Sequence, residues 1–313
     1  MKGAVIVKIY EYTPGEKVGI GRSVIALGFF DGVHKGHRCL LESARRLAKD
    51  KNYTFAVFTF HAEDGFKGDG ALYPNEEKLR LFDSLGVEAV IIAKFASVSG
   101  ISADEFVKRA LIVDMECRTA VAGYDFRFGK GALGDAELLT NILRDSGREC
   151  IIESEHKIKG EKISTTKIKE LLSLGKVDEA REFLGAPFRL TARVEHGLGK
   201  GVSLGFPTVN TPTAHLKKGV YRTATEISGA LYNSITNIGT CPTISERALH
   251  AETYIIDYSG DLYGKEIRIF FLGYLREEKR FSSPEELIMQ INVDKNRAIK
   301  ENGDLKWQEI GPN

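Results

Sequence analysis

The chain has 313 residues, which is long for one hydrophobic core and sufficient for two domains. Hydrophobic residues make up 42% and charged residues 28% of it, a composition typical of soluble globular proteins. Its 44 basic and 43 acidic residues leave a net charge of +1, so no electrostatic surplus favours nucleic acid or an anionic membrane as the main partner.

The sequence carries no sign of export or of membrane insertion. Its apolar runs are of strand length, far shorter than a bilayer span, and the N-terminal run is soon broken by charge and proline. The four cysteines are scattered and form no CxxC pair, so neither a zinc site nor a disulfide framework is indicated. We therefore expect a cytoplasmic protein without a membrane partner. The sequence leaves the oligomeric state open.

The first half alternates between apolar runs of strand length and amphipathic runs of helix length. Strands are predicted at residues 23–29, 55–60, 87–93, 119–122 and 149–153. Helices are predicted between them at residues 38–49, 75–85, 102–111 and 135–146, the third opening with a capping box of Ser102 and Glu105. This rhythm predicts an α/β domain with a parallel sheet covered on both faces, whose ligands bind beyond the carboxyl ends of the strands.

The pattern of the sequence changes between the two halves. Two short helices, predicted at residues 164–174 and 177–184, end the first half. Short β-rich runs separated by turn residues then predict a small antiparallel β-barrel, at residues 188–194, 219–227, 230–238, 251–258 and 265–274. A terminal helix is predicted at residues 284–300. The change of composition near residues 185–187 predicts two domains, 1–185 and 186–313.

Residues 28–37 read GFFDGVHKGH and lie between a predicted strand and a predicted helix. Backbone N–H groups of such a loop, together with the helix N-terminus, form an anion site. His34 and His37 are one helical turn apart, so both imidazoles can point the same way. Two imidazoles beside a helix N-terminus suit an ATP α-phosphate, whose transition state gathers negative charge on its oxygens.

Residues 197–210 read GLGKGVSLGFPTVN and match neither the P-loop nor the dinucleotide fingerprint. What remains is a glycine loop, with Gly199 and Gly201, followed by Pro-Thr-x-Asn. On a strand, Thr208 and Asn210 point to the same face, because side chains alternate. A hydroxyl and an amide oxygen are ligands suited to Mg²⁺ that bridges ATP phosphates.

The first half resembles the HxGH nucleotidyltransferases, and more narrowly the FMN adenylyltransferase domain of bacterial bifunctional riboflavin kinase/FAD synthetases. The resemblance rests on GFFDGVHKGH, on GYDFRFG at residues 123–129, on ISADEF at residues 101–106 and on ISTTKIK at residues 163–169. It implies a Rossmann-like fold. It also implies that ATP is contacted by Gly28, Phe30, Asp31, Gly32, Asp125, Ser164, Thr165, Thr166 and Lys169, and flavin by Phe126 and Phe128.

The second half resembles the riboflavin kinase domain of the same enzymes. LGFPTVN at residues 204–210, KGVY at 218–221, TNIGTCPT at 236–243, DLYG at 261–264 and REEKRF at 276–281 follow the family order. The strand with AETY at residues 251–254 resembles the one that carries the family's catalytic glutamate, which maps to Glu252. Tyr254 is then a flavin contact, Gly199, Gly201 and Thr208 contact ATP, and Thr208 with Asn210 holds Mg²⁺.

These resemblances imply a bifunctional transferase that phosphorylates riboflavin to FMN and adenylylates FMN to FAD, with ATP, Mg²⁺ and flavins as its ligands. His34 and His37 stabilise the α-phosphate in the second step, and Glu252 is the base in the first. The chain departs from the family at residues 61–64, which read HAED, and at Ala132, Lys169 and Val202. Two alternatives therefore stay open: a kinase whose adenylyltransferase half has decayed, and a catalytically silent flavin sensor or regulator.

Overall fold

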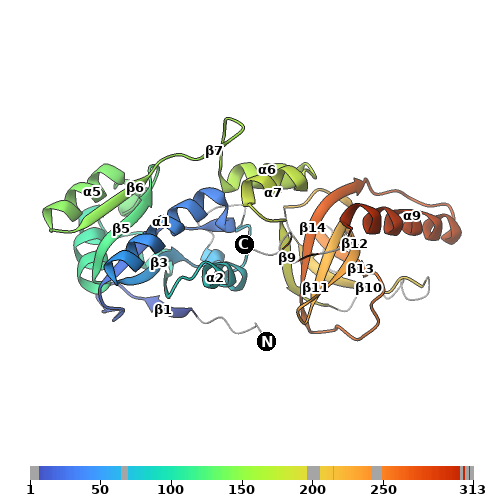
Figure 1. Ribbon diagram of the computed structural model, residues 1–313, viewed down its shortest axis with the longest axis horizontal. Helices are drawn as coiled ribbons and strands as arrows, with labels where there is room; N and C mark the ends of the chain where they lie inside the picture. Colours follow the sequence, from blue (N-terminus) through green and yellow to red (C-terminus); the bar gives the residue numbers. More distant parts are fainter. Residues whose placement is uncertain are drawn as a thin grey trace. The chain divides into compact units, whose positions relative to one another are not determined.

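The computed structural model describes residues 7–64, 70–195, 205–213, 215–240, 249–303, 306 and 310. The chain divides into two compact units, Met1–Thr165 and Thr166–Asn313, each built around its own sheet (Figure 1). The helices α6 (Thr165–Ser173) and α7 (Val177–Leu184) belong almost entirely to the second unit by this division. The predicted domain boundary after residue 185 lies later in the chain and stays a prediction.

The described part of the first unit contains a six-stranded sheet in the order β1-β4-β3-β2-β5-β6, and every pair in it is parallel. Its strands are β1 (Lys8–Tyr12), β2 (Ser23–Leu27), β3 (Thr54–Phe60), β4 (Ala89–Ala93), β5 (Cys117–Gly123) and β6 (Glu149–Glu153). The chain leaves β2 toward one edge and β5 toward the other, so the strand order reverses between β2 and β5. The predicted parallel sheet is confirmed, and ligands of such sheets bind at this reversal.

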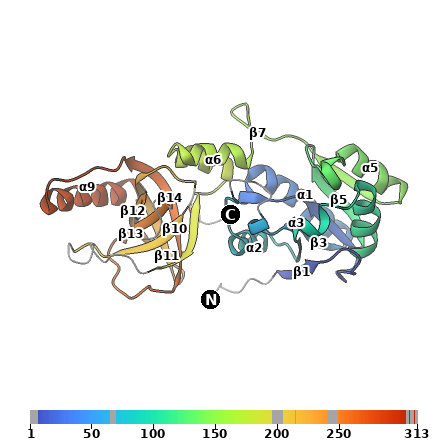
Figure 2. The ribbon, with the colours of Figure 1, turned by 180° about the vertical axis from the view of Figure 1, so that it is seen from behind.

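Helices cover the sheet of the first unit, and the helix α3 (Phe95–Val98) is seen from behind in Figure 2. The longer helices are α1 (Lys35–Lys51), α2 (Asn75–Ser84) and α5 (Ala136–Asp145), and α4 (Ala103–Glu105) is a single short turn. The Ser102 hydroxyl accepts a hydrogen bond from the Glu105 N–H at 3.1 Å, which confirms the predicted cap, and a π-helix then runs over Phe106–Asp114. Apolar side chains of this π-helix and of α5 pack against one face of the sheet to form a hydrophobic core.

Short elements complete the first unit. The strands β7 (Lys157–Ile158) and β8 (Glu161–Lys162), of two residues each, form an antiparallel hairpin. Single 3₁₀ turns lie at Asp31–Val33, Ala62–Asp64 and Lys130–Ala132. The first of these turns follows β2 directly and therefore lies at the carboxyl edge of the sheet.

The second unit is an antiparallel six-stranded sheet, in its described part, in the order β10-β13-β12-β11-β14-β9 (Figures 1 and 2). Its strands are β9 (Arg189–Arg193), β10 (Thr208–Thr213), β11 (Gly219–Ile227), β12 (Ala230–Thr240), β13 (Leu249–Ile255) and β14 (Glu266–Arg276). An antiparallel bridge between Glu195 and Asn210 brings the two edges together, so the sheet curls into a nearly closed barrel. This confirms the predicted barrel.

The helix α9 (Pro284–Asn302) ends the barrel unit, in agreement with the predicted terminal helix. Its start is capped by the Ser283 hydroxyl, which accepts from the Glu286 N–H at 3.2 Å. The Arg276 guanidinium donates to both carboxylate oxygens of the buried Asp294, at 2.8 to 3.2 Å, and so ties α9 to the end of β14.

Candidate functional site

The loop after β2 takes an unusual backbone path. Phe30, Gly32 and Val33 have positive φ angles of 52°, 77° and 41°. Such conformations cost free energy for residues other than glycine and persist when the surroundings hold them. Here the Phe30 ring is buried edge-on against Phe82, with ring centroids 5.8 Å apart, and a Cβ added at Gly28 would lie 3.0 Å from that ring. Gly28 therefore leaves the space that Phe30 fills.

His34 and His37 lie together at the start of α1. His34 is the N-cap residue, and its Nδ1 accepts a hydrogen bond from the His37 N–H at 3.2 Å. The two rings are stacked, with centroids 3.6 Å apart and an angle of 13° between their planes. His34 is buried and His37 half-buried against the edge of Phe30. The turn thus holds both imidazoles beside a helix N-terminus, where an anion is favoured.

A distant segment reaches the same loop. The Thr165 hydroxyl is buried and donates to the backbone carbonyl of Asp31 at 3.0 Å. The Asp31 carboxylate in turn accepts from the Leu72 N–H at 2.7 Å. This bond brings Thr165 of the predicted nucleotide site beside Asp31 of the GFFDG loop. Ser164 is half-buried, whereas Thr166 is exposed and Lys169 is buried, both on the part of α6 that belongs to the second unit.

The segment after β5 lies on the other side of the strand-order reversal. Asp125 is exposed, and its carboxylate accepts a hydrogen bond from Lys162 Nζ at 2.7 Å, which raises the pKa of Lys162. The rings of Phe126 and Phe128 are stacked with centroids 5.5 Å apart. Phe128 is 6% exposed and belongs to the hydrophobic core, while Phe126 is half-buried at its margin. Of these two predicted flavin contacts, Phe126 offers more surface to a ligand.

Two of the positions where the first half departs from the family are His61 and Ala132. His61 follows β3, and its ring nitrogens contact the Glu11 carboxylate at 3.0 Å and the Asn75 amide at 3.2 Å. Ala132 is exposed and has a positive φ of 55°. His61 therefore makes polar contacts to side chains on β1 and α2.

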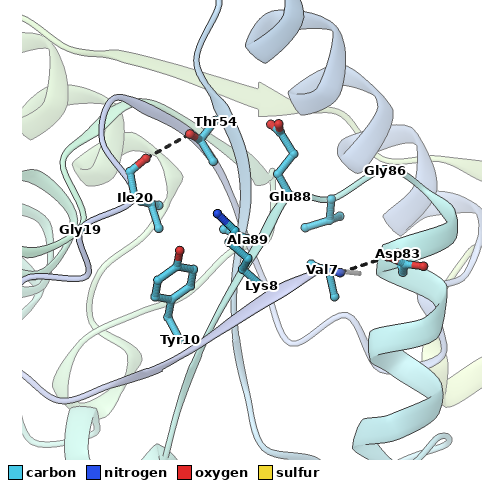
Figure 3. A pocket seen from close by; sticks show the side chains of 11 residues that line it. Val7, Lys8, Tyr10, Gly19, Ile20, Thr54, Asp83, Gly86, Glu88 and Ala89 are labelled. Atoms are coloured by element: carbon cyan, nitrogen blue, oxygen red, sulfur yellow. Dashed lines mark hydrogen bonds between the residues drawn. The ribbon is translucent and has the colours of Figure 1, made fainter. Parts of the chain in front are cut away.

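A cavity of about 550 Å³ opens in the first unit at the amino-terminal ends of β1, β3 and β4, whereas the loop with His34 and His37 lies at the carboxyl ends of the strands (Figure 3). Its two carboxylates already accept backbone N–H groups: Asp83 from Val7 at 3.1 Å, and Glu88 from Phe55 at 2.8 Å. Among the described residues that line it, none belongs to the predicted nucleotide site. The cavity and the predicted nucleotide site therefore lie at opposite ends of the strands.

In the second unit, four predicted residues face one another across two strands. Thr208 and Asn210 on β10 pair with Tyr254 and Glu252 on β13, in that order. Because side chains alternate along a strand, all four share one face of the sheet. Glu252 is exposed, and the other three are half-buried. The hydroxyl, amide and carboxylate oxygens on this face are the donors that Mg²⁺ takes, so the residues fit the metal.

Two further residues adjoin this face. Asn237 on β12 pairs with Glu252 from the other side, and its amide donates to the Glu278 carboxylate at 3.4 Å. The Phe206 ring meets the Tyr254 ring edge-on at 5.2 Å. Both residues lie within motifs that resemble the family's, TNIGTCPT and LGFPTVN, but no role was predicted for either of them. Gly199, Gly201 and Val202 lie outside the described residues.

Comparison with known proteins decides between the functional interpretations. The FAD synthetase family model matches residues 19–167 and the riboflavin kinase family model matches residues 184–301. A curated relative from Bacillus subtilis (strain 168), named bifunctional riboflavin kinase/FMN adenylyltransferase, is 32% identical over 91% of this chain and 94% of its own length. The relative of the same name from Escherichia coli (strain K12) is 33% identical, over 87% of this chain and 90% of its own.

The chain belongs to the bifunctional riboflavin kinase/FMN adenylyltransferase family. It carries both of the family's transferase domains, which use ATP and flavins, and this favours the bifunctional interpretation over the two alternatives. A crystal structure described as a macrolide-efflux protein from Streptococcus pneumoniae has the same fold, with a TM-score of 0.84 and 28% identity over 95% of this chain and 100% of its own. Within the described part of the chain, no helix is both long and apolar enough to span a bilayer.

Proposed function

We propose that the barrel unit phosphorylates riboflavin on the face shared by Thr208, Asn210, Glu252 and Tyr254, and that the first unit adenylylates FMN at the loop that carries His34 and His37. The observation that carries the proposal is the register of β10 and β13, which places Asn210 directly opposite Glu252. Two residues far apart in sequence, each predicted for one chemical role, thereby become neighbours. Such convergence is what a site requires.

In the kinase step, the ribityl hydroxyl oxygen attacks the γ-phosphorus of ATP. The new O–P bond forms as the bond between that phosphorus and the β,γ-bridging oxygen breaks, the hydroxyl proton passes to the Glu252 carboxylate, and ADP leaves. Exposure of Glu252 leaves the carboxylate accessible to a substrate hydroxyl. Positioning and charge stabilisation supply most of the rate in phosphoryl transfer, and the base adds roughly 10²–10⁴-fold.

Thr208 and Asn210 would hold Mg²⁺ in this unit; when bound, the metal neutralises charge on the ATP phosphates. The half-buried ring of Tyr254, already in contact with Phe206, offers an apolar surface for flavin. Gly199 and Gly201 are proposed to contact the phosphates with their backbone N–H groups.

In the adenylylation step, a phosphate oxygen of FMN attacks the α-phosphorus of ATP, and the bond from that phosphorus to the departing pyrophosphate breaks. This step needs no protein nucleophile. His34 and His37 would stabilise the charge on the α-phosphate, because their imidazoles are held at the N-terminus of α1. Thr165 would keep the Asp31 backbone in place, since its hydroxyl already bonds that carbonyl. Use of ATP fits a cytoplasmic location.

The test is to incubate the purified protein with riboflavin and Mg-ATP and to separate riboflavin, FMN and FAD by chromatography at successive times. We expect FMN to rise first and FAD to follow. FMN without FAD would support a kinase alone, and a lack of both products would support a silent flavin-binding protein.

A further inference from the structure

The lysine Lys78 on α2 is almost completely buried, at 2% exposure. Lysines are seldom buried to this degree unless their charge is balanced by specific contacts. Lys78 Nζ donates to the Phe60 carbonyl at 2.7 Å and to the Thr59 hydroxyl at 3.3 Å, both at the carboxyl end of β3. It also lies 5.0 Å from the centre of the Phe29 ring, within the range of a cation–π contact. Its ammonium group is thus aimed at the edge of the sheet where the adenylyltransferase loop begins.

A chain of hydrogen bonds leads from this ammonium group into the loop. The Thr59 hydroxyl, which accepts from Lys78, donates to the backbone carbonyl of Phe29 at 2.9 Å. Phe29 immediately precedes Phe30, where the backbone enters the left-handed region. Lys78 therefore holds Phe29 in two ways. It acts on the Phe29 carbonyl through the Thr59 hydroxyl, and it contacts the Phe29 ring directly.

The rest of α2 contacts the same loop. Phe82, one turn along from Lys78, packs edge-on against Phe30. The segment before the helix donates the Leu72 N–H to Asp31. A strained loop keeps its conformation only when its surroundings fix it. Contacts from α2 and from the segment before it thus reach three consecutive residues of the loop, Phe29, Phe30 and Asp31, and Lys78 supplies the cationic one.

We propose that Lys78 is a positioning residue for the adenylylation step: its ammonium group fixes the Phe29–Phe30 backbone and thereby the stacked His34 and His37. This assignment rests on the proposed adenylyltransferase site. Lys78 acts through Thr59 and Phe29 and does not itself bond the reacting phosphates.

The position of Lys78 makes this role dependent on pH. Burial lowers the pKa of Lys78 to about 8 from the ordinary value of 10.5, although nearby carboxylates oppose this change. The charged groups that face it are Asp31 on the 3₁₀ turn after β2, and Glu63 and Asp64 on the turn after β3, with His61 beside them held by Glu11 and Asn75. The cation–π contact and the strength of both hydrogen bonds therefore fall as the pH rises through about 8.

The effect on folding stability has the opposite sign. Because the folded-state pKa lies below the ordinary value, the unfolded chain binds more protons between pH 8 and 10.5, so this titration raises the free energy of unfolding with pH. A loss of adenylylation in this range is then not a consequence of unfolding driven by Lys78.

The experiment measures both activities of the full chain, with riboflavin or FMN supplied separately, from pH 7 to 9.5. In the wild-type protein we expect adenylylation to fall as the pH rises through about 8, relative to the kinase activity of the same sample. The variant K78R keeps its charge throughout, because arginine does not titrate here, and its profile should stay flat. The variant K78M should lose adenylylation at least tenfold at pH 7 and keep kinase activity.

An unchanged adenylylation rate in K78M would overturn the proposal, and so would an alkaline fall in K78R that matches the wild type. Should K78M fail to fold, as judged by its melting curve, the comparison of wild type with K78R decides the matter. If K78R also fails to fold, a wild-type adenylylation profile without an alkaline fall would be decisive against Lys78. Failure of the proposed function is a separate result, since the wild-type protein would then form no FAD.

Discussion

At the scale of single residues, Glu252 is the most direct test of the kinase site, because it lies between Asn210 and Asn237 on neighbouring strands. The change Glu252→Gln keeps shape and hydrogen-bonding capacity and removes basicity. Steady-state kinetics should show riboflavin phosphorylation slowed by roughly 10²–10⁴-fold, with smaller effects on ATP and riboflavin affinity. Glu266→Gln, at the start of β14, is the matched control and should leave the rate unchanged. Wild-type turnover in Glu252→Gln would place the base elsewhere.

Thr208 should respond in a different way, because a metal ligand affects use of Mg-ATP. In Thr208→Ala the hydroxyl is lost while Asn210 keeps its place on the same face. We expect the concentration of Mg²⁺ needed for half-maximal kinase activity to rise, and added Mg²⁺ to restore part of the rate. A Mg²⁺ titration of both proteins checks this. A reduced rate that no Mg²⁺ concentration improves would remove Thr208 from the proposed metal ligands.

His37 offers the corresponding test in the other unit. In His37→Ala the ring that stacks on His34 is gone, while the cap bond from the residue 37 backbone N–H can remain. FAD formation from supplied FMN should fall by two orders of magnitude or more, in line with roughly 10²–10³-fold for a lost charge-stabilising donor. FMN formation in the same sample is the control and should stay near the wild-type rate. Equal FAD formation would show that the α-phosphate binds away from this loop.

At the scale of elements, the helices α6 and α7 pack on the barrel. The Lys217 N–H donates to the Leu172 carbonyl at 3.1 Å, and Arg222 pairs with Asp178 at 3.3 Å. A fragment of residues 166–313 should therefore melt at a higher temperature than one of residues 186–313, since the shorter one exposes apolar surface under α7. Thermal melting and a riboflavin kinase assay on both fragments check this. Equal melting temperatures would support the predicted boundary after residue 185.

The elements also show where sequence patterns carry information. Buried parallel strands such as β2 and β4 read as continuous apolar runs, and their predicted bounds lie within two residues of the observed ones. The edge strand β1 was not predicted, because only one of its five residues is buried and no apolar run marks it. Lys78 was not predicted to have a role either. Nothing local distinguishes a lysine that is buried by contacts from β3 and from the loop after β2 from a solvated helical lysine.

At the scale of the whole molecule, the order of the motifs along the chain was a stronger indication of the family than any single motif. The register of β10 and β13 places residues of two separate motifs on one face of the sheet. The hydrogen bond between Thr165 and Asp31 joins segments that are more than a hundred residues apart in the sequence. No local pattern encodes such a register, because it depends on how the strands of the finished sheet pair. The contacts of α6 and α7 with the barrel are likewise not visible in the sequence, because they join helices to strands that are far along the chain.

The bridge that nearly closes the barrel has a consequence for self-association. The Glu195 N–H donates to the Asn210 carbonyl at 2.8 Å, and this contact joins the two strands that would otherwise be the free edges of the sheet. Unpaired strand edges are templates for pairing with another chain and for aggregation. Asn210 thus contributes its side chain to the candidate metal site and its backbone carbonyl to the contact with Glu195 that nearly closes the barrel. A ligand that binds to β10 only when the barrel is closed therefore stabilises the closed barrel. It also disfavours the open form, whose free strand edges would allow aggregation.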